Sequence, residues 1–357
     1  MTDEPLPENS APASPDATGE KKHRRRVRYS GKNPRRFDQK YKEHNPEKYG
    51  DTVAKVLASG KTPAGTHRSI MVAEILHVLA PKPREVAVDC TLGFGGHARE
   101  ILKSLQPGGK LIGVDADPVE LPKTEARLRE LGFGPETFIT KRSNFAGLRQ
   151  VLTELHLEGA DVILADLGLS SMQIDDPARG FSTKFEGPLD MRMNPQRGQP
   201  ASAFLEKISV EALTTLLLEN ADEPRAQKIA PLLAGKKFST TKELSNTIAA
   251  ALPQLGKDEC TLSIRRVFQA IRIAVNDEFS ALDTFLRNLP FCLNPNGRVA
   301  ILTFHSGEDR RVKKAFEAGR RDGFYSEIAD EVIRPTSEER RDNPRSSPAK
   351  LRWAKKT

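Results

Sequence analysis

The sequence predicts an α/β fold in which a parallel sheet with crossover helices is interrupted by an all-helical insertion. Three observations predict it. From residue 67 onward, short apolar runs alternate with amphipathic stretches, which is the pattern of strands joined by crossover helices. Between residues 168 and 263 the strand pattern stops and amphipathic helical patterns replace it. A further apolar run at residues 298–304 then resumes the sheet.

The first half of the sheet is expected to contain four strands, at residues 85–90, 110–114, 137–140 and 161–165. A helix over residues 97–105 should follow the first strand, and another should begin after Pro118 and end near Leu131. Proline suits the first helical turn because its missing N–H would be unpaired there in any case.

The insertion begins after Gly168, and one of its helices is opened by Thr240 and Glu243 in a capping-box spacing. After it, apolar residues recur at intervals of three and four, which predicts one long helix with a single buried face. These residues are Val267, Ala270, Ile271, Ala274, Val275, Leu282, Leu286 and Leu289.

The 357 residues therefore divide into an α/β domain of residues 66–168 and 264–357, a helical insertion of residues 169–263, and an N-terminal extension of residues 1–65. The extension is rich in Pro, Ser, Gly and charge and has no hydrophobic periodicity, which is typical of disorder. The chain carries a net charge of +8, and residues 21–48 alone contribute +9. With Tyr29, Phe37 and Tyr41 interleaved, this arm suits a polyanion such as RNA, although a solvated tail without a partner has the same composition.

Several classes of protein are disfavoured by composition. The three cysteines Cys90, Cys260 and Cys292 form no CxxC or Cys/His cluster, so we expect reduced thiols, no disulfide framework and no metal site. Residues 1–10 lack the basic and apolar regions of a secretion signal, and no apolar run approaches the roughly eighteen residues that a membrane span needs. These features predict a cytoplasmic protein.

The clearest motif follows the first predicted strand, as Asp89-x-Thr91-x-Gly93-x-Gly95-Gly96-His97. Glycines between a strand and a helix let the backbone approach a ligand closely. Asp115 ends the second strand, where a carboxylate can accept hydrogen bonds from both hydroxyls of a ribose. The two features together predict a nucleotide cofactor.

Two cofactors compete for this turn. Gly93, Gly95 and Ala98 satisfy the NAD fingerprint. Asp89, the doubled glycine and a third acid after the fourth strand favour S-adenosylmethionine, which carries a sulfonium cation in place of a pyrophosphate. We therefore predict S-adenosylmethionine.

Candidate catalytic residues lie at two strand ends and in one loop. Asp166, Ser170 and Ser171 follow the fourth strand, where oxygen acceptors could hold the hydrogens of an exocyclic amine and make its nitrogen more nucleophilic. Asp190 lies in the turn-like segment of residues 187–193, and His305 follows the last strand. Asp166 as a turn cap and His305 as a structural residue remain open alternatives.

Taken jointly, the motifs resemble the ribosomal RNA small subunit methyltransferase H family, the MraW-like cytosine-N4 methyltransferases. The resemblance covers residues 67–352 and rests on the motifs above together with further segments. These are His67 with Glu74, Asp166 to Gln173, Arg179 to Ser182, Gly187 to Met193, Phe268 to Ile273, Phe304 to Ser306 and Asn343 to Arg345.

This resemblance implies a class I, Rossmann-like methyltransferase sheet whose helical insertion recognises the substrate. It implies N4-methylation of cytosine 1402 in 16S rRNA, with the rRNA within the small ribosomal subunit as the expected partner, and it leaves monomer and homodimer open. The cofactor contacts that it implies are Gly95, Gly96, His97, Asp115, Phe145, Asp166 and Gln173.

The sequence departs from the family pattern at Gly307, where the family usually has leucine, and at residues 220–222, where it tends to have Tyr-Gly-Glu. The segment after Asn343 also lacks the family's second arginine. An NAD-dependent oxidoreductase and a non-catalytic RNA-binding assembly factor are the alternative functions.

Overall fold

The computed structural model describes Asp51 and residues 69–357 of the chain. The predicted N-terminal extension and His67 therefore lie outside the described residues, apart from Asp51. Among the described residues no helix is long and apolar enough to cross a membrane.

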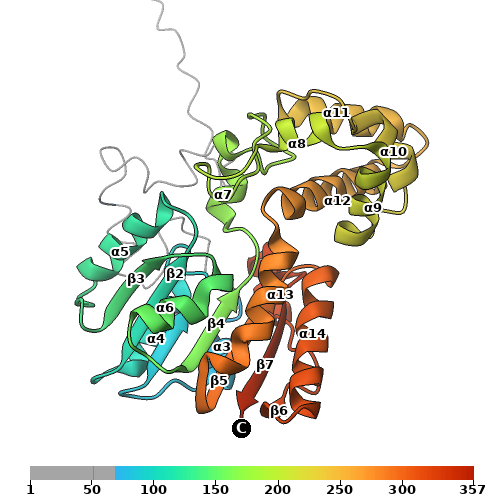
Figure 1. The fold of residues 1–357 in the computed structure, drawn as a ribbon. Helices are drawn as coiled ribbons and strands as arrows, with labels where there is room; N and C mark the ends of the chain where they lie inside the picture. The colour runs from blue at the N-terminus through green and yellow to red at the C-terminus, as the bar shows by residue number, and fades with distance from the viewer. Residues whose placement is uncertain (1–50, 52–68) are drawn as a thin grey trace, which may run out of the picture.

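Seven strands form one sheet in the order β3-β2-β1-β4-β5-β7-β6 (Figure 1). The strands are β1 (Val86–Asp89), β2 (Lys110–Asp115), β3 (Phe138–Arg142), β4 (Ala160–Asp166), β5 (Leu293–Thr303), β6 (Tyr325–Ile328) and β7 (Lys350–Lys356). The five predicted strands are confirmed, and β1 to β5 pair with one another in parallel. The expectation of a wholly parallel sheet is wrong, because β7 pairs antiparallel with both β5 and β6.

The helices of the α/β part cover both faces of this sheet. They are α3 (Val72–Leu79), α4 (Gly96–Leu105), α5 (Glu120–Glu130), η2 (Phe145–Gly147), α6 (Leu148–Glu154), α13 (Glu278–Asn288), η4 (Leu289–Phe291), α14 (Ser306–Arg321), α15 (Ser337–Asp342) and η5 (Pro344–Ser346). The predicted helices at residues 97–105 and after Pro118 correspond to α4 and α5.

Two apolar cores follow from the alternation of side chains along each strand. Ala87 and Leu111 pack with α3, α4 and α5 on one face. Val88 and Ile112, the next residues along the same strands, pack with α6, α13 and α14 on the other. Both faces of the sheet are therefore buried, as parallel sheets require.

The helical part lies beyond one end of the sheet (Figure 1). It contains α7 (Ser171–Asp175), η3 (Pro177–Arg179), α8 (Ala201–Lys207), α9 (Val210–Ala221), α10 (Ala226–Leu233), α11 (Thr241–Ala251) and α12 (Lys257–Val275). Thr240 caps α11 by accepting from the backbone N–H of Glu243 at 3.1 Å, as predicted. The other half of the predicted capping box is not formed, because the Glu243 side chain accepts from the N–H of Ser239 at 2.8 Å.

The single long helix predicted over residues 267–289 is wrong. The chain forms α12 and α13 instead, and the break falls at Asn276 and Asp277, where Asp277 adopts a left-handed conformation with φ of 51°. Val275 and Leu282, on either side of the break, are seven residues apart, which is the spacing of two helical turns, so the apolar pattern alone could not reveal the break.

This break also bears on the predicted domain boundary after Ser263, which falls inside α12. Val267, Phe268 and Ile271 of α12 are buried in the helical cluster with α8 to α11. Leu282 and Leu286 of α13 belong to a core of the sheet. We therefore propose that the insertion ends at Asn276.

Candidate active site

The glycine turn connects β1 to α4 at the carboxyl end of the sheet. Gly93 and Gly95 have φ values of 48° and 79°, which favour glycine. A Cβ on Gly95 would lie 2.8 Å from Cγ2 of Thr124, so a side chain there would collide with α5. Glycine at position 95 thus lets the turn pack closely against α5.

Three carboxylates meet beside this turn because β2, β1 and β4 are neighbours and end at the same edge. They are Asp89, Asp115 and Asp166. The chain order reverses between β1 and β4, and such reversals are where open parallel sheets bind ligands. Thr91 joins two of these acids: its hydroxyl accepts from the N–H of Asp166 at 2.6 Å, and its own N–H donates to Asp89 at 3.1 Å.

Burial makes this negative charge costly. Asp89 is 1% exposed, and burial raises the pKa of its carboxyl to about 6. Burial also raises the pKa of Asp115. Oδ2 of Asp115 accepts from Gly93 N–H at 2.8 Å and Oδ1 accepts from Asp117 N–H at 2.8 Å, so Asp115 holds the glycine turn in place.

His97 lies at the first turn of α4 among these acids and is 7% exposed. Its Nε2 lies 3.4 Å from Oδ2 of Asp166, close enough for an ion pair, yet this atom makes no hydrogen bond within the described residues. Burial by itself would lower the pKa of His97, but Asp166 and Asp89 outweigh it and raise that pKa. Of the three acids, His97 is within ion-pair distance only of Asp166, so net negative charge remains beside the glycine turn and favours a cationic ligand.

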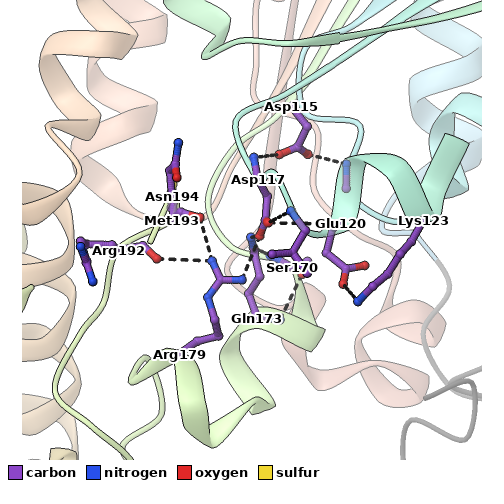
Figure 2. A network of polar contacts seen from close by, with 12 residues as sticks. Asp115, Asp117, Glu120, Lys123, Ser170, Gln173, Arg179, Arg192, Met193 and Asn194 are labelled. Atoms are coloured by element: carbon purple, nitrogen blue, oxygen red, sulfur yellow. Dashed lines mark hydrogen bonds and ion pairs between the residues drawn. The ribbon is translucent and has the colours of Figure 1, made fainter. Parts of the chain in front are cut away.

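Asp117 is a central residue of this region that the sequence analysis missed. It is 1% exposed; its Oδ1 accepts from the N–H of Val119 at 2.9 Å, and its Oδ2 accepts from Gln173 and Arg179, each at 2.9 Å (Figure 2). Burial opposes ionisation, but Gln173 and the charge of Arg179 outweigh it and lower the pKa of Asp117. Its position two residues after Asp115 was the available signal, but Arg179 is a partner that only the fold supplies.

Ser170 and Gln173 form a capping box at the start of α7. The Ser170 hydroxyl accepts from Gln173 N–H at 3.2 Å, and the Gln173 side chain accepts from Ser170 N–H at 3.0 Å. Gln173 thereby lies beside Asp117 at the cofactor edge. The side chain of Ser171 lies outside the described residues.

Phe145 begins η2 after β3 and packs into a core. Its ring meets that of Phe285 edge to face, with centroids 5.5 Å apart. Phe145 is only partly buried, so the contact with Phe285 does not occupy its whole ring. Its role as a contact for the cofactor stays a prediction.

The Asp190 carboxylate is paired with the Arg192 guanidinium. The two side chains form a bidentate pair at 2.8 and 2.7 Å, and the Arg192 N–H donates to the same carboxylate at 3.0 Å. Burial opposes ionisation of Asp190, but these hydrogen bonds outweigh it and lower its pKa. This engagement favours a role in holding Arg192 over a role in proton transfer.

His305 caps α14. Its Nδ1 accepts from Glu308 N–H at 3.4 Å, and its Nε2 lies 3.2 Å from Oε1 of Glu308. With Glu278, these residues offer ligand atoms within 4.8 Å of one another, a grouping that sequence spacing did not reveal. Both oxygens of Glu278 already accept from Arg272 at 2.8 Å, so a guanidinium supplies the positive charge there.

The donor set beside the glycine turn distinguishes the two cofactors. Three carboxylates attract the sulfonium and ammonium groups of S-adenosylmethionine and repel a pyrophosphate. The residues present therefore fit S-adenosylmethionine, and Gly95, Gly96, His97, Asp115 and Gln173 stay predicted contacts with it.

Comparison with known proteins supports the same conclusion. Residues 64–357 match the model of the MraW methylase family. The chain belongs to that family. The resemblance and the cofactor predicted from the motifs are thereby confirmed, and an NAD-dependent oxidoreductase is excluded.

Relatives within the family are similar over nearly the whole chain. The ribosomal RNA small subunit methyltransferase H 1 of Lachnoclostridium phytofermentans is 49% identical and covers 95% of both chains. The methyltransferase H 2 of Alkaliphilus metalliredigens is 51% identical over 94% of this chain and 98% of its own. A solved putative rRNA-methylase from Clostridium thermocellum aligns with 82% of this chain and 100% of its own, at 10% identity and a TM-score of 0.41.

The family motifs that are distant in sequence meet around the cofactor edge. Arg345, from the Asn343-Pro344-Arg345 segment, donates to Asp175 of α7 at 2.6 Å.

The departure from the family pattern at Gly307 has a local cause, since a Cβ there would lie 2.6 Å from the ring of Phe279. Asp222, from the departure at residues 220–222, accepts from the neighbouring Ser306 hydroxyl at 2.8 Å. Two of the departures thus lie at one contact between α9 and α14.

Proposed function

We propose that this methyltransferase transfers a methyl group from S-adenosylmethionine to N4 of cytosine 1402 in 16S rRNA. The coarser statement, methylation of small-subunit ribosomal RNA, is supported by the names of relatives that are 49% and 51% identical. The observation that carries the chemistry is the meeting of Asp166 and the glycine turn at one edge of the sheet.

The cofactor, when bound, supplies an electrophilic methyl group on a sulfonium. Asp89, Asp115 and Asp166 give this edge the negative charge that attracts it. An incoming exocyclic amine must lose conjugation with its ring before its nitrogen can react. In this proposal Asp166, whose backbone N–H donates to the Thr91 hydroxyl, accepts a hydrogen of that amine and takes its proton.

The cytosine must leave its base stack to reach an edge built this way, so we expect it to be flipped between the sheet and the helical part. The protein then contributes orientation and electrostatics, and no covalent enzyme intermediate is needed.

The RNA is expected to be held in part by the basic arm of residues 21–48, which lies outside the described residues. Deleting residues 1–60 should weaken RNA binding and flatten its salt dependence, because fewer counterions are released. Fluorescence anisotropy at several salt concentrations measures both. An unchanged slope would show that the arm does not contact the RNA.

The test of the function is incubation of the purified protein with methyl-labelled S-adenosylmethionine and unmodified small subunits, followed by nuclease digestion and mass identification of the nucleoside. N4-methylcytidine at position 1402 is expected. Label on another nucleoside would overturn the substrate assignment. Cofactor binding without any label would favour a non-catalytic assembly factor.

A further inference from the structure

A continuous series of hydrogen bonds runs from the glycine turn into the helical insertion. It starts at Asp115, which accepts from Gly93 on one side and from Asp117 on the other, both through backbone N–H groups at 2.8 Å. The Asp117 carboxylate then accepts from Gln173 and Arg179 (Figure 2). The cofactor edge is therefore connected to a side chain that belongs to the insertion.

Arg179 continues the series into the segment of residues 187–194, here called the 187–194 loop. It donates to the carbonyl oxygens of Met193 at 2.7 Å and Arg192 at 3.3 Å. Asn276 holds the same loop from the other side: it accepts from Met193 N–H at 2.7 Å and donates to Met191 carbonyl oxygen at 2.8 Å. The series thus ends at the break between α12 and α13.

Movement of this loop would be costly at the Asp117 end. Asp117 is 1% exposed, and Arg179 is the positively charged group paired with it, at 15% exposure. Separating them would leave a buried carboxylate without its counter-charge, which is strongly unfavourable. A displacement of the 187–194 loop should therefore shift Asp117 with it. Asp115 would shift too, because it accepts a hydrogen bond from the Asp117 N–H.

We propose that Asp117 is a positioning residue whose pair with Arg179 makes cofactor binding and RNA binding cooperative. In this proposal, a bound cofactor fixes the positions of Asp115 and Asp117. Through its hydrogen bonds, Arg179 then fixes the 187–194 loop in the conformation that binds RNA. Because binding linkage is reciprocal, RNA must tighten cofactor binding by the same factor. This rests on the proposed function, since it requires that one chain binds both.

The experiment measures the affinity of the full chain for unmodified small subunits with and without saturating S-adenosylhomocysteine, which binds without turnover. The wild type should bind about tenfold more tightly with it, within the usual range of such couplings. Asp117→Asn and Arg179→Gln should each reduce this factor below about twofold. The double variant should be no worse than either single one, because both break the same contact.

Arg298→Gln is the matched control. Arg298 is also 15% exposed and also pairs with a carboxylate, that of Glu85 at 2.8 Å. It also donates to backbone carbonyl oxygens, in this case the three of Leu79, Ala80 and Asp161. It lies at the opposite end of the sheet. The Arg298→Gln variant should lose stability as Arg179→Gln does, but it should keep the full coupling between cofactor binding and RNA binding. This separates a positioning role from a general loss of structure.

Labelled methyl transfer by the wild type runs in parallel. Two results would overturn the proposed cooperativity and leave the proposed function standing. One is full coupling in both Asp117→Asn and Arg179→Gln, and the other is no coupling in a wild type that methylates subunits. Equal loss of coupling in Arg298→Gln would overturn it too. A wild type that binds S-adenosylhomocysteine but neither binds nor methylates subunits would overturn the proposed function itself.

Discussion

The charged side chains at the two ends of the sheet are paired to different extents. At the amino end, Arg298 donates two hydrogen bonds to Glu85 and others to three backbone carbonyl oxygens, so positive and negative groups balance. At the carboxyl end, Asp89, Asp115 and Asp166 gather with like charge, and of these three only Asp166 has a cationic partner within ion-pair distance among the described residues, the Nε2 of His97 at 3.4 Å. A balanced end supports the fold, and an unbalanced end is prepared for a ligand.

The comparison is tested most severely at Asp166, where we expect the largest effect on the reaction. Asp166→Ala removes the group placed to accept an amine hydrogen, so the single-turnover rate should fall about a hundredfold or more. Rapid-quench assays with labelled cofactor and unmodified subunits measure it. A rate equal to that of the wild type would remove Asp166 from the chemistry.

A second test asks whether the carboxyl end is strained by its own charge. The folded pKa of Asp89 is about 6, above its usual 3.8, so the stability linked to its neutral form is present below about pH 4 and lost as the pH rises through 6. Asp89→Asn should therefore gain stability over the wild type between pH 4 and pH 7, by up to about 3 kcal/mol.

Urea unfolding of both proteins at pH 4, 5, 6 and 7 checks this. The pKa of His97 is raised as well, partly by Asp89, so the stability linked to its charged form is also lost as the pH rises. This loss should be smaller in Asp89→Asn than in the wild type, which adds to the expected difference. A difference between the two proteins that does not vary with pH would mean that Asp89 is not strained.

Asp115 provides a third test, on ligand affinity. Asp115→Ala should weaken S-adenosylmethionine binding at least about tenfold, because a hydrogen bond to a charged group contributes about 1.5 to 3 kcal/mol. Asp161→Ala is its counterpart at the amino end, where Asp161 holds the N–H of Val86 at 2.8 Å. Calorimetry should find a loss of affinity only in the first; equal affinity in both would reject the ribose contact.

The smallest effect on the reaction is expected at Arg298. Arg298→Gln should lower the free energy of unfolding by about 2 kcal/mol, because Glu85 loses its partner in a partly buried site. Methylation by the folded variant should stay within about twofold of the wild type. Thermal melts and single-turnover assays on one preparation decide this, and a large loss of rate would erase the distinction between the two ends.

Much of this could be predicted from the sequence because it is encoded locally. Strands β1 to β5 follow apolar runs, and the glycine turn follows from residues adjacent in the chain. Cofactor residues such as Asp115 were found because a strand end fixes where a side chain lies. The family motifs then identified the chemistry.

The rest depends on contacts between distant segments. Asp117 looks like an ordinary helix-capping acid until Arg179, far along the chain, is placed against it. The break between α12 and α13 depends on Asn276 binding the 187–194 loop, and no apolar spacing encodes that. Strand β7 was missed because its antiparallel place between β5 and β6 is set by pairing and not by a pattern of its own.

The insertion also has a consequence for how the protein is made. Strand β4 pairs with β5, and the entire helical part is synthesised between them. While the ribosome builds α7 to α12, the outer edge of β4 has no partner, and an unpaired strand edge is a template for aggregation. We expect the nascent chain to depend on early folding of the insertion or on a chaperone at that stage, and pulse proteolysis of stalled chains ending before and after Thr303 would reveal when the edge closes.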